Sequence, residues 1–203
     1  RVRSSAASDV YKRQKICSLN FKRPEKSDRY NPFVYIERED DMLRVVKALH
    51  EACRPKKEAS MADPFWDDAV DLYLMAIFYY TWLDARERNT VGTMNDVLAL
   101  ANLETQTVID PQTEEEVSRL QLLMDEKEHT YGADYPPVRD YRKLKGGAPD
   151  TVRSVILMIN GMLAVCETAE VKRIFSGNDI DIREIGTGVG GNPEKGVYLF
   201  LII

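Results

Sequence analysis

The pattern of apolar and polar residues favours a β-strand at each end of the chain. Ile16–Phe21 is a short alternating run, and the chain closes on Lys195–Ile203, with the sequence KGVYLFLII. An uninterrupted β-forming run of this kind is typical of a buried strand in a parallel sheet, which needs neighbouring strands. Such strands carry function on the loop after their carboxyl end, and the sequence stops before that loop. We therefore expect an internal piece of a larger protein.

Helix start signals divide the residues between these ends. Asp40 or Asp41 can cap a helix that ends near Cys53, before Arg54-Pro55. Asp63-Pro64 is a strong start because Asp accepts free amide hydrogen bonds and Pro at the first helical position has no amide to lose. Further starts are marked by Thr93 with Asp96, Thr113 with Glu116, Pro136-Pro137, Pro149-Asp150 and Thr168. Together these signals predict about seven helices.

The helix that starts at Pro64 is expected to be the central helix of a bundle, because its second half is apolar all round. Its aromatic residues are predicted to lie in the core: Trp66, Tyr73, Tyr79, Tyr80 and Trp82. A base-stacking platform is the alternative, but it would need interleaved basic residues, and none occurs between Lys57 and Arg86. Leu72–Leu83 is an uncharged run of 12 residues, whereas a membrane-spanning helix needs about 20. We expect no transmembrane or signal segment and a chain that is itself soluble.

Charge is distributed unevenly along the 203 residues. Residues 39–185 hold 17 Lys and Arg against 28 Asp and Glu, a net charge of −11. Since nucleic-acid affinity comes largely from Lys and Arg that neutralise phosphates, such a surface suits a basic protein better than DNA. A merely solvated acidic surface is the alternative. The densest basic run is Arg139, Arg142, Lys143 and Lys145, which would carry DNA binding if the domain gripped DNA.

Candidate chemistry is sparse. The glycine-rich segment Gly186–Gly191 lacks the Lys-Ser or Lys-Thr ending of a P-loop and precedes a strand, the reverse of the order that cradles phosphate. Asp67-Asp68 with Asp71 could bind a cation, or could simply compensate a helix dipole. We assign no catalytic, cofactor-binding or metal-binding residue.

Histidines and cysteines add no site. His50 and His129 fall in different predicted helices without an evident partner, so we expect both at the surface or at an edge. Cys17, Cys53 and Cys166 are far apart, which argues against zinc, a disulfide framework or a thiol nucleophile and fits a reducing cytoplasm.

Several segments together resemble one family, the TraG-type coupling proteins of conjugative type IV secretion. They are Leu19-Asn20-Phe21, Tyr30–Ile36 (YNPFVYI), Asp63–Trp66 (DPFW), Asp179–Gly188 (DIDIREIGTG) and Gly196–Ile203. The first three look like the family's segment after its P-loop. The last two are similar to its return from a helical insertion into the motor-domain sheet.

The resemblance implies a mainly α chain: an all-α insertion domain flanked by a few strands of a RecA-like P-loop α/β domain. The expected divisions are 15–38 for the first motor-domain piece, 39–185 for the helical domain and 186–203 for the returning loop and strand. Residues 1–14 resemble translated sequencing-adapter strings, with a short disordered native arm as the alternative.

The resemblance also implies a function, a DNA-translocating ATPase that recruits relaxase-bound DNA to the secretion channel. The parent protein would be a homohexamer at the cytoplasmic face of the inner or cell membrane and would use ATP and Mg²⁺. The helical domain would recognise the relaxase or an accessory protein, without contacting the membrane. No GxxxxGK[ST] and no apolar strand followed by Asp-Glu occurs in this chain, so we expect it to be inactive alone. A freestanding helical adaptor, or part of another ring-forming translocase or helicase, remains the alternative.

Overall fold

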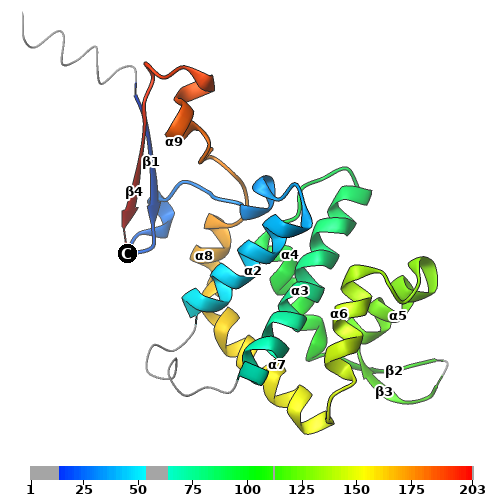
Figure 1. Cartoon of the computed structure of the whole chain (residues 1–203). Coiled ribbons are helices and arrows are strands. Elements are labelled where there is room, and N and C mark those ends of the chain that lie inside the picture. The colour runs from blue at the N-terminus through cyan, green and yellow to red at the C-terminus, as the bar shows by residue number, and fades with distance from the viewer. Residues whose placement is uncertain (1–13, 54–63, 112, 203) are drawn as a thin grey trace, which may run out of the picture. The chain divides into compact units, whose positions relative to one another are not determined.

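The computed structural model describes residues 14–53, 64–111 and 113–202, and the chain forms two compact units. The larger unit is residues 32–168, and the smaller one combines the two ends of the chain, 1–31 and 169–203. Figure 1 shows the course of the chain. The expected non-native tail, the loop before Asp63 and the cap at Asp63 lie outside the described residues, except for Gln14.

The larger unit is a bundle of α-helices with one small hairpin. Its helices are α2 (Glu39–Cys53), α3 (Pro64–Glu87), α4 (Met94–Glu104), α5 (Arg119–Tyr131), α6 (Pro136–Lys145) and α7 (Pro149–Leu163). Short 3-10 helices, η2 (Pro32–Tyr35) and η3 (Ala164–Glu167), lie at its two ends. The antiparallel strands β2 (Thr107–Ile109) and β3 (Glu116–Ser118) form the hairpin between α4 and α5.

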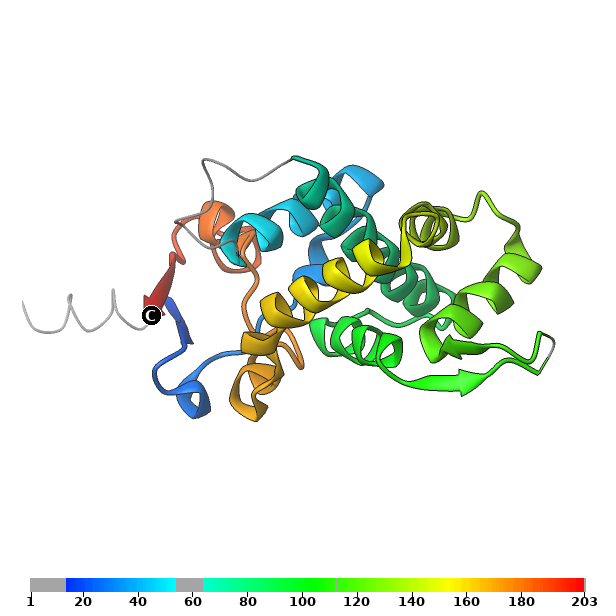
Figure 2. The ribbon, with the colours of Figure 1, turned by 90° about the horizontal axis from the view of Figure 1, so that it is seen from below.

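The core is built around α3, as its all-round apolar second half predicts. Tyr73, Leu74, Ile77 and Phe78 are fully buried, and α3 packs against α2, α4, α6 and α7. Figure 2 shows α7 crossing the bundle in front of α3 when the molecule is seen from below. Trp82 is also buried, and its indole Nε1–H donates to the Ile36 carbonyl oxygen at 3.2 Å.

The prediction that Trp66 is buried was wrong. Trp66 is half-buried, and its ring packs edge-to-face on exposed Phe65 with centroids 5.6 Å apart. Both residues lie in the first turn of α3.

Capping signals located most helix starts correctly. Thr93 and Asp96 form the predicted capping box at α4, with Asp96 N–H donating to Thr93 Oγ1 at 3.2 Å and Thr93 N–H donating to Asp96 Oδ2 at 2.8 Å. The predicted start at Thr113 with Glu116 was wrong. Thr113 instead donates to Asp110 Oδ2 at 2.8 Å within the hairpin turn, and Glu116 begins β3. Ser118 caps α5 instead, because pairing of β2 with β3 extends the backbone up to that residue.

Strands from the two ends of the chain pair in the smaller unit. β1 (Lys15–Asn20) and β4 (Val197–Ile202) are parallel, with Lys15 opposite Val197 and Asn20 opposite Ile202. The parallel arrangement predicted from the C-terminal run is confirmed. The prediction that this run is buried was wrong. Tyr198, Phe200 and Leu201 are exposed, and β4 has one partner strand in the described residues.

Helical segments of the smaller unit are tied to the stretch after β1. They are α8 (Ala169–Ile174) and α9 (Glu184–Thr187), together with the 3-10 helices η1 (Pro24–Lys26) and η4 (Val189–Gly191). Arg29 donates through Nε and Nη2 to the Asp179 carboxylate at 2.8 and 2.7 Å, and Tyr30 N–H donates to the Ile174 carbonyl at 2.9 Å. These long-range contacts place residues 169–185 in the smaller unit, whereas we expected the helical domain to extend from 39 to 185. Among the described residues, the α-helices α2 to α8 lie between Glu39 and Ile174, which agrees with the expected number of about seven.

Candidate functional site

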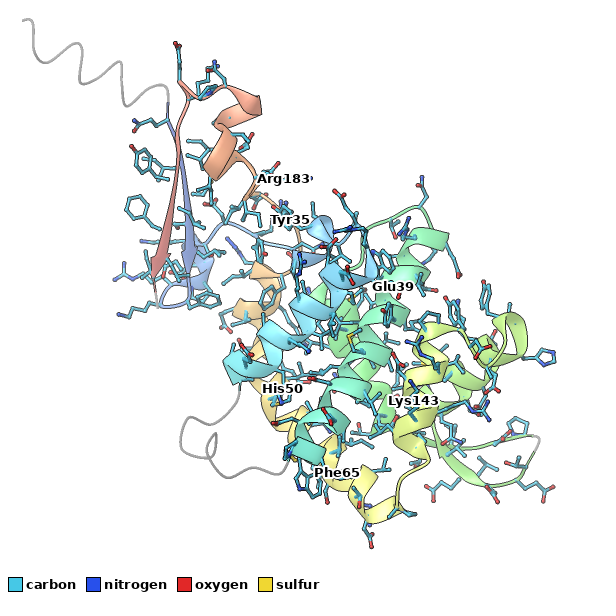
Figure 3. All side chains as sticks on the ribbon, in the orientation of Figure 1. Tyr35, Glu39, His50, Phe65, Lys143 and Arg183 are labelled. Atoms are coloured by element: carbon cyan, nitrogen blue, oxygen red, sulfur yellow. The ribbon has the colours of Figure 1, made fainter. Side chains whose placement is uncertain are left out.

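The placement of His50 differs from its prediction. It is buried on the last turn of α2, and its Nδ1 lies 2.7 Å from Asp71 Oδ1 on α3 (Figure 3). Its Nε2 lies 3.6 Å from Asp67 Oδ1. The interpretation of His50 as a surface histidine without a partner was wrong. The acidic face of α3 that could bind a cation is instead occupied by this imidazole, which joins α2 to α3.

The glycine-rich loop binds a carboxylate of its own unit. Gly190 N–H donates to Glu184 Oε1 at 3.0 Å, and Lys15 Nζ lies 3.0 Å from Glu184 Oε2. The Gly190 hydrogen bond, followed by the contact with Lys15, lowers the pKa of Glu184. Gly188 needs its positive φ of 79°, and a Cβ there would overlap the Asn192 carbonyl. The loop is thus shaped by a tight turn before β4.

All members of the densest basic run on α6 are paired with carboxylates. Arg139 donates to Asp140 at 2.8 and 3.1 Å, and Lys143 lies 3.7 Å from the same carboxylate. Arg142 pairs with Glu128, and Lys145 Nζ lies 3.3 Å from Glu104 Oε1. Because these charges are already neutralised by neighbours, the run offers little to a phosphate backbone.

The β2–β3 hairpin is rich in acidic side chains. Residues 107–118 contain Asp110, Glu114, Glu115 and Glu116 and neither Lys nor Arg. The three glutamates are exposed. The β2–β3 hairpin therefore projects concentrated negative charge from one side of the larger unit.

A buried polar cluster, which the sequence did not reveal, lies between this hairpin and α6. The Glu104 side chain is only 3% exposed. It accepts hydrogen bonds on Oε2 from the hydroxyls of Tyr141 at 2.8 Å and Ser118 at 3.2 Å, and Lys145 approaches its Oε1. Burial, and then the Glu104 charge, raise the pKa of Tyr141 well above its usual value. The cluster links α4, β3 and α6, which makes the hairpin a fixed part of the unit.

Comparison with protein families gives one match over nearly the whole chain. A family model described as type IV secretory system conjugative DNA transfer matches residues 8–203. The chain belongs to this family. The resemblance found in the YNPFVYI, DPFW and C-terminal segments is thereby confirmed at the level of the family. Comparison with curated proteins gives no match.

In this conjugative DNA transfer protein, the described residues do not assemble a metal site. Within residues 14–53, 64–111 and 113–202, no group of three or more His, Cys, Asp or Glu side chains could hold a metal ion. The sequence-based assignment of no catalytic or cofactor-binding residue stays a prediction.

Within the described residues, one helical stretch of the chain is long and apolar enough to span a membrane. It is Pro149–Glu167, with 19 residues and a mean hydropathy of 1.2. Only 28% of its apolar window is buried. The expectation of no transmembrane segment rests on Leu72–Leu83, and this second stretch has an uncharged centre of its own, Ser154–Cys166.

Proposed function

We propose that the larger unit is the substrate-docking domain of a coupling ATPase that brings a relaxase, or an accessory protein bound to it, to the type IV secretion channel. Family membership supports a role in conjugative DNA transfer. In this proposal ATP, Mg²⁺ and the translocated DNA are bound by the rest of a homohexameric motor at the cytoplasmic face of the membrane. The larger unit then contributes selection of the protein cargo.

The observation that carries this proposal is the contrast between the basic run on α6 and the β2–β3 hairpin. Arg139, Arg142, Lys143 and Lys145 are paired with acids, whereas Glu114 and Glu115 are exposed with no basic residue on their own hairpin. An open acidic surface repels a phosphate backbone and attracts a basic protein. Charge therefore favours protein docking over DNA gripping.

Two rivals remain as outcomes of the test. A freestanding adaptor would bind protein without any coupling to conjugation, and family membership weighs against it. A DNA-gripping element would need the α6 basic residues to release their carboxylate partners.

The proposal is tested by two titrations of the full 203-residue chain. One uses the relaxase encoded by the same conjugative DNA element, and the other uses duplex DNA. Each titration is run at about 0.05 and 0.2 M salt, since a protein with several phosphate contacts loses about 10³–10⁵ in DNA affinity over this range. We expect relaxase binding that weakens with salt and poor binding of duplex DNA.

Two charge-reversing variants test whether the acidic residues of the hairpin bind the relaxase. The double variant Glu114→Lys, Glu115→Lys is expected to weaken relaxase binding about tenfold, because each exposed charge pair contributes about 0.2–1 kcal/mol and reversal adds repulsion. Glu51→Lys is the control, an exposed position on the last turn of α2 where a basic residue suits the helix dipole. In both Figure 1 and Figure 2, α2 and the hairpin lie on opposite sides of the larger unit. Sub-micromolar, salt-dependent DNA binding with no relaxase binding would reassign the unit as a DNA-gripping element.

A further inference from the structure

Helix α7 has a second apolar face, besides the one that packs in the core. Val152, Val155, Ile159 and Leu163 point into the bundle and are buried. Outside it, Leu157 is 66% exposed and Met158 is 45% exposed, and the same face continues through Gly161 to exposed Val165 in η3. We call Leu157, Met158, Gly161 and Val165 the α7 stripe. Their i, i+1, i+4 and i+8 positions share one helix face, the pattern by which two helices pack together.

A cavity adjoins this stripe. Its volume is about 570 Å³, within the range of about 300–1,000 Å³ that is common for ligand pockets. Val152, Ile156 and Leu157 of α7 form its apolar wall, and Glu104 and Glu116 are its acidic residues. Arg153 also lines the cavity, and its Nη1 lies 3.8 Å from Asp150 Oδ1. The ammonium of Lys145, also in the lining, is neutralised by Glu104 at 3.3 Å, whereas Glu116 is exposed at the start of β3.

Space beside Gly161 is open among the residues that the structure describes. A Cβ added to Gly161 would meet no atom within 4 Å. Small residues at such a position let the backbone of a partner helix approach closely. A helix lying along α7 could therefore contact the stripe and place one side chain in the cavity.

Charge selects among the possible occupants. Residues 32–168 contain 15 Lys and Arg against 25 Asp and Glu, so the larger unit is strongly negative. A second copy of the unit would bring the same negative charge, and an anionic membrane surface would repel it. A basic partner would be attracted, and it would also cover the apolar surface that a solvent-exposed helix does not normally present.

We propose that the α7 stripe and the adjoining cavity seat a basic amphipathic helix of the partner protein. An apolar side chain of that helix fills the cavity between Ile156 and Leu157, and a basic side chain meets Glu116. This inference rests on the proposed docking function, which it refines from a charged surface to a groove with a defined occupant.

The test uses the full chain and a synthetic peptide of lysine and leucine, about 18 residues long so that it can form a helix, with leucines at helical spacing. A second peptide of the same composition has its leucines scrambled off one face. Titration of the wild-type chain should show binding of the first peptide at least about tenfold tighter than the second. Leu157→Glu, Met158→Glu should weaken the first peptide at least about tenfold, whereas Val91→Glu, an exposed apolar position in the loop between α3 and α4, should change it less than about twofold.

Circular dichroism of each variant shows whether the helices remain, and Leu157→Ser repeats the test without added charge. Equal binding of both peptides, or equal binding to the stripe variant, would mean attraction by charge alone and would overturn the groove. The groove would also be overturned if the wild-type chain self-associates, or binds anionic vesicles, and the Leu157→Glu, Met158→Glu variant does not. The stripe would then contact a second copy of the chain or a membrane. Relaxase binding that needs Glu114 and Glu115 but not Leu157 would overturn the groove and leave the docking function standing. Peptide binding without any relaxase binding would support the groove and overturn the docking function.

Discussion

Two buried tyrosines of the larger unit are expected to respond oppositely to loss of their hydroxyl groups. Tyr141 donates its O–H to the buried Glu104 carboxylate at 2.8 Å. Tyr73 is fully buried on α3, and its hydroxyl has no hydrogen-bond partner among the residues that the structure describes. Replacing either residue by Phe keeps the ring and leaves only the space of one oxygen atom, so the comparison isolates the hydrogen bond.

The expected magnitudes follow from these surroundings. A hydrogen bond to a charged group contributes about 1.5–3 kcal/mol, and an unsatisfied buried polar group costs about 1–3 kcal/mol. Glu104 keeps Ser118 and Lys145 as partners after Tyr141→Phe, which places the expected loss near the lower end, at about 2 kcal/mol. Tyr73→Phe removes a buried hydroxyl without breaking a bond, so stability should be unchanged or rise by about 1 kcal/mol.

Urea unfolding followed by tryptophan fluorescence measures both changes. The chain has 2 tryptophans, Trp66 and Trp82, and both lie in the larger unit, so the signal reports on that unit alone. The midpoint and slope of each transition give the free energy of unfolding by linear extrapolation. A slope that differs from wild type would show that the unfolded or native state had changed in compactness, or that unfolding was no longer two-state. For such a variant, unfolding would first be repeated with a second spectroscopic signal before its midpoint is compared with wild type.

Two results would refute the reasoning. Tyr141→Phe within about 0.5 kcal/mol of wild type would mean that the Glu104 cluster contributes no more than a surface contact. Tyr73→Phe as destabilising as Tyr141→Phe would mean that the Tyr73 hydroxyl is hydrogen-bonded in solution.

Three further expectations concern nucleotide chemistry, acid stability and the junction of α2 with α3. The purified chain should neither bind ATP tightly nor hydrolyse it, because the Gly190 amide is bound by a carboxylate of its own loop region; phosphate release that Gly190→Ala abolishes would contradict this. The hydrogen bond from Arg29 lowers the pKa of Asp179 from 3.8 to about 2, so this contact stabilises the smaller unit above pH 3.8 and is lost as pH falls through about 2. Amide exchange of β1 and β4 between pH 5 and 2 should show this, and Asp179→Asn should weaken the pH dependence, part of which remains because the pKa of Glu184 in the same unit is also lowered; an unchanged pH profile in that variant would count against the assignment. His50→Ala should cost about 1–3 kcal/mol in urea unfolding by removing the partner of Asp71, and a wild-type midpoint would show that the pair contributes nothing.

Local signals in the sequence predict most of the helices and their order. The Thr93 capping box begins α4, because its side chains satisfy amides within one turn of the helix start. Pro136 and Pro149 begin α6 and α7, because proline at the first helical position has no amide to leave unpaired. The central place of α3 followed from its apolar second half, since a helix without a polar face must be covered on all sides. The parallel pairing of β4 followed in the same way from an apolar run without alternation.

Which side chains meet depends on how the helices and strands pack. Thr113 and Glu116 carry a capping pattern, but β2 and β3 pair and pull them into a hairpin, so a contact outside the local segment overrode the local signal. His50 finds its carboxylate 21 residues further along the chain, and Arg29 finds Asp179 at a separation of 150. Packing of the helices brings these charges together, and no spacing in the sequence records it. Packing also determines the effect of the basic run and of the acidic surplus, which the sequence showed only as composition. The basic residues of α6 are paired with carboxylates, whereas the glutamates of the hairpin are exposed.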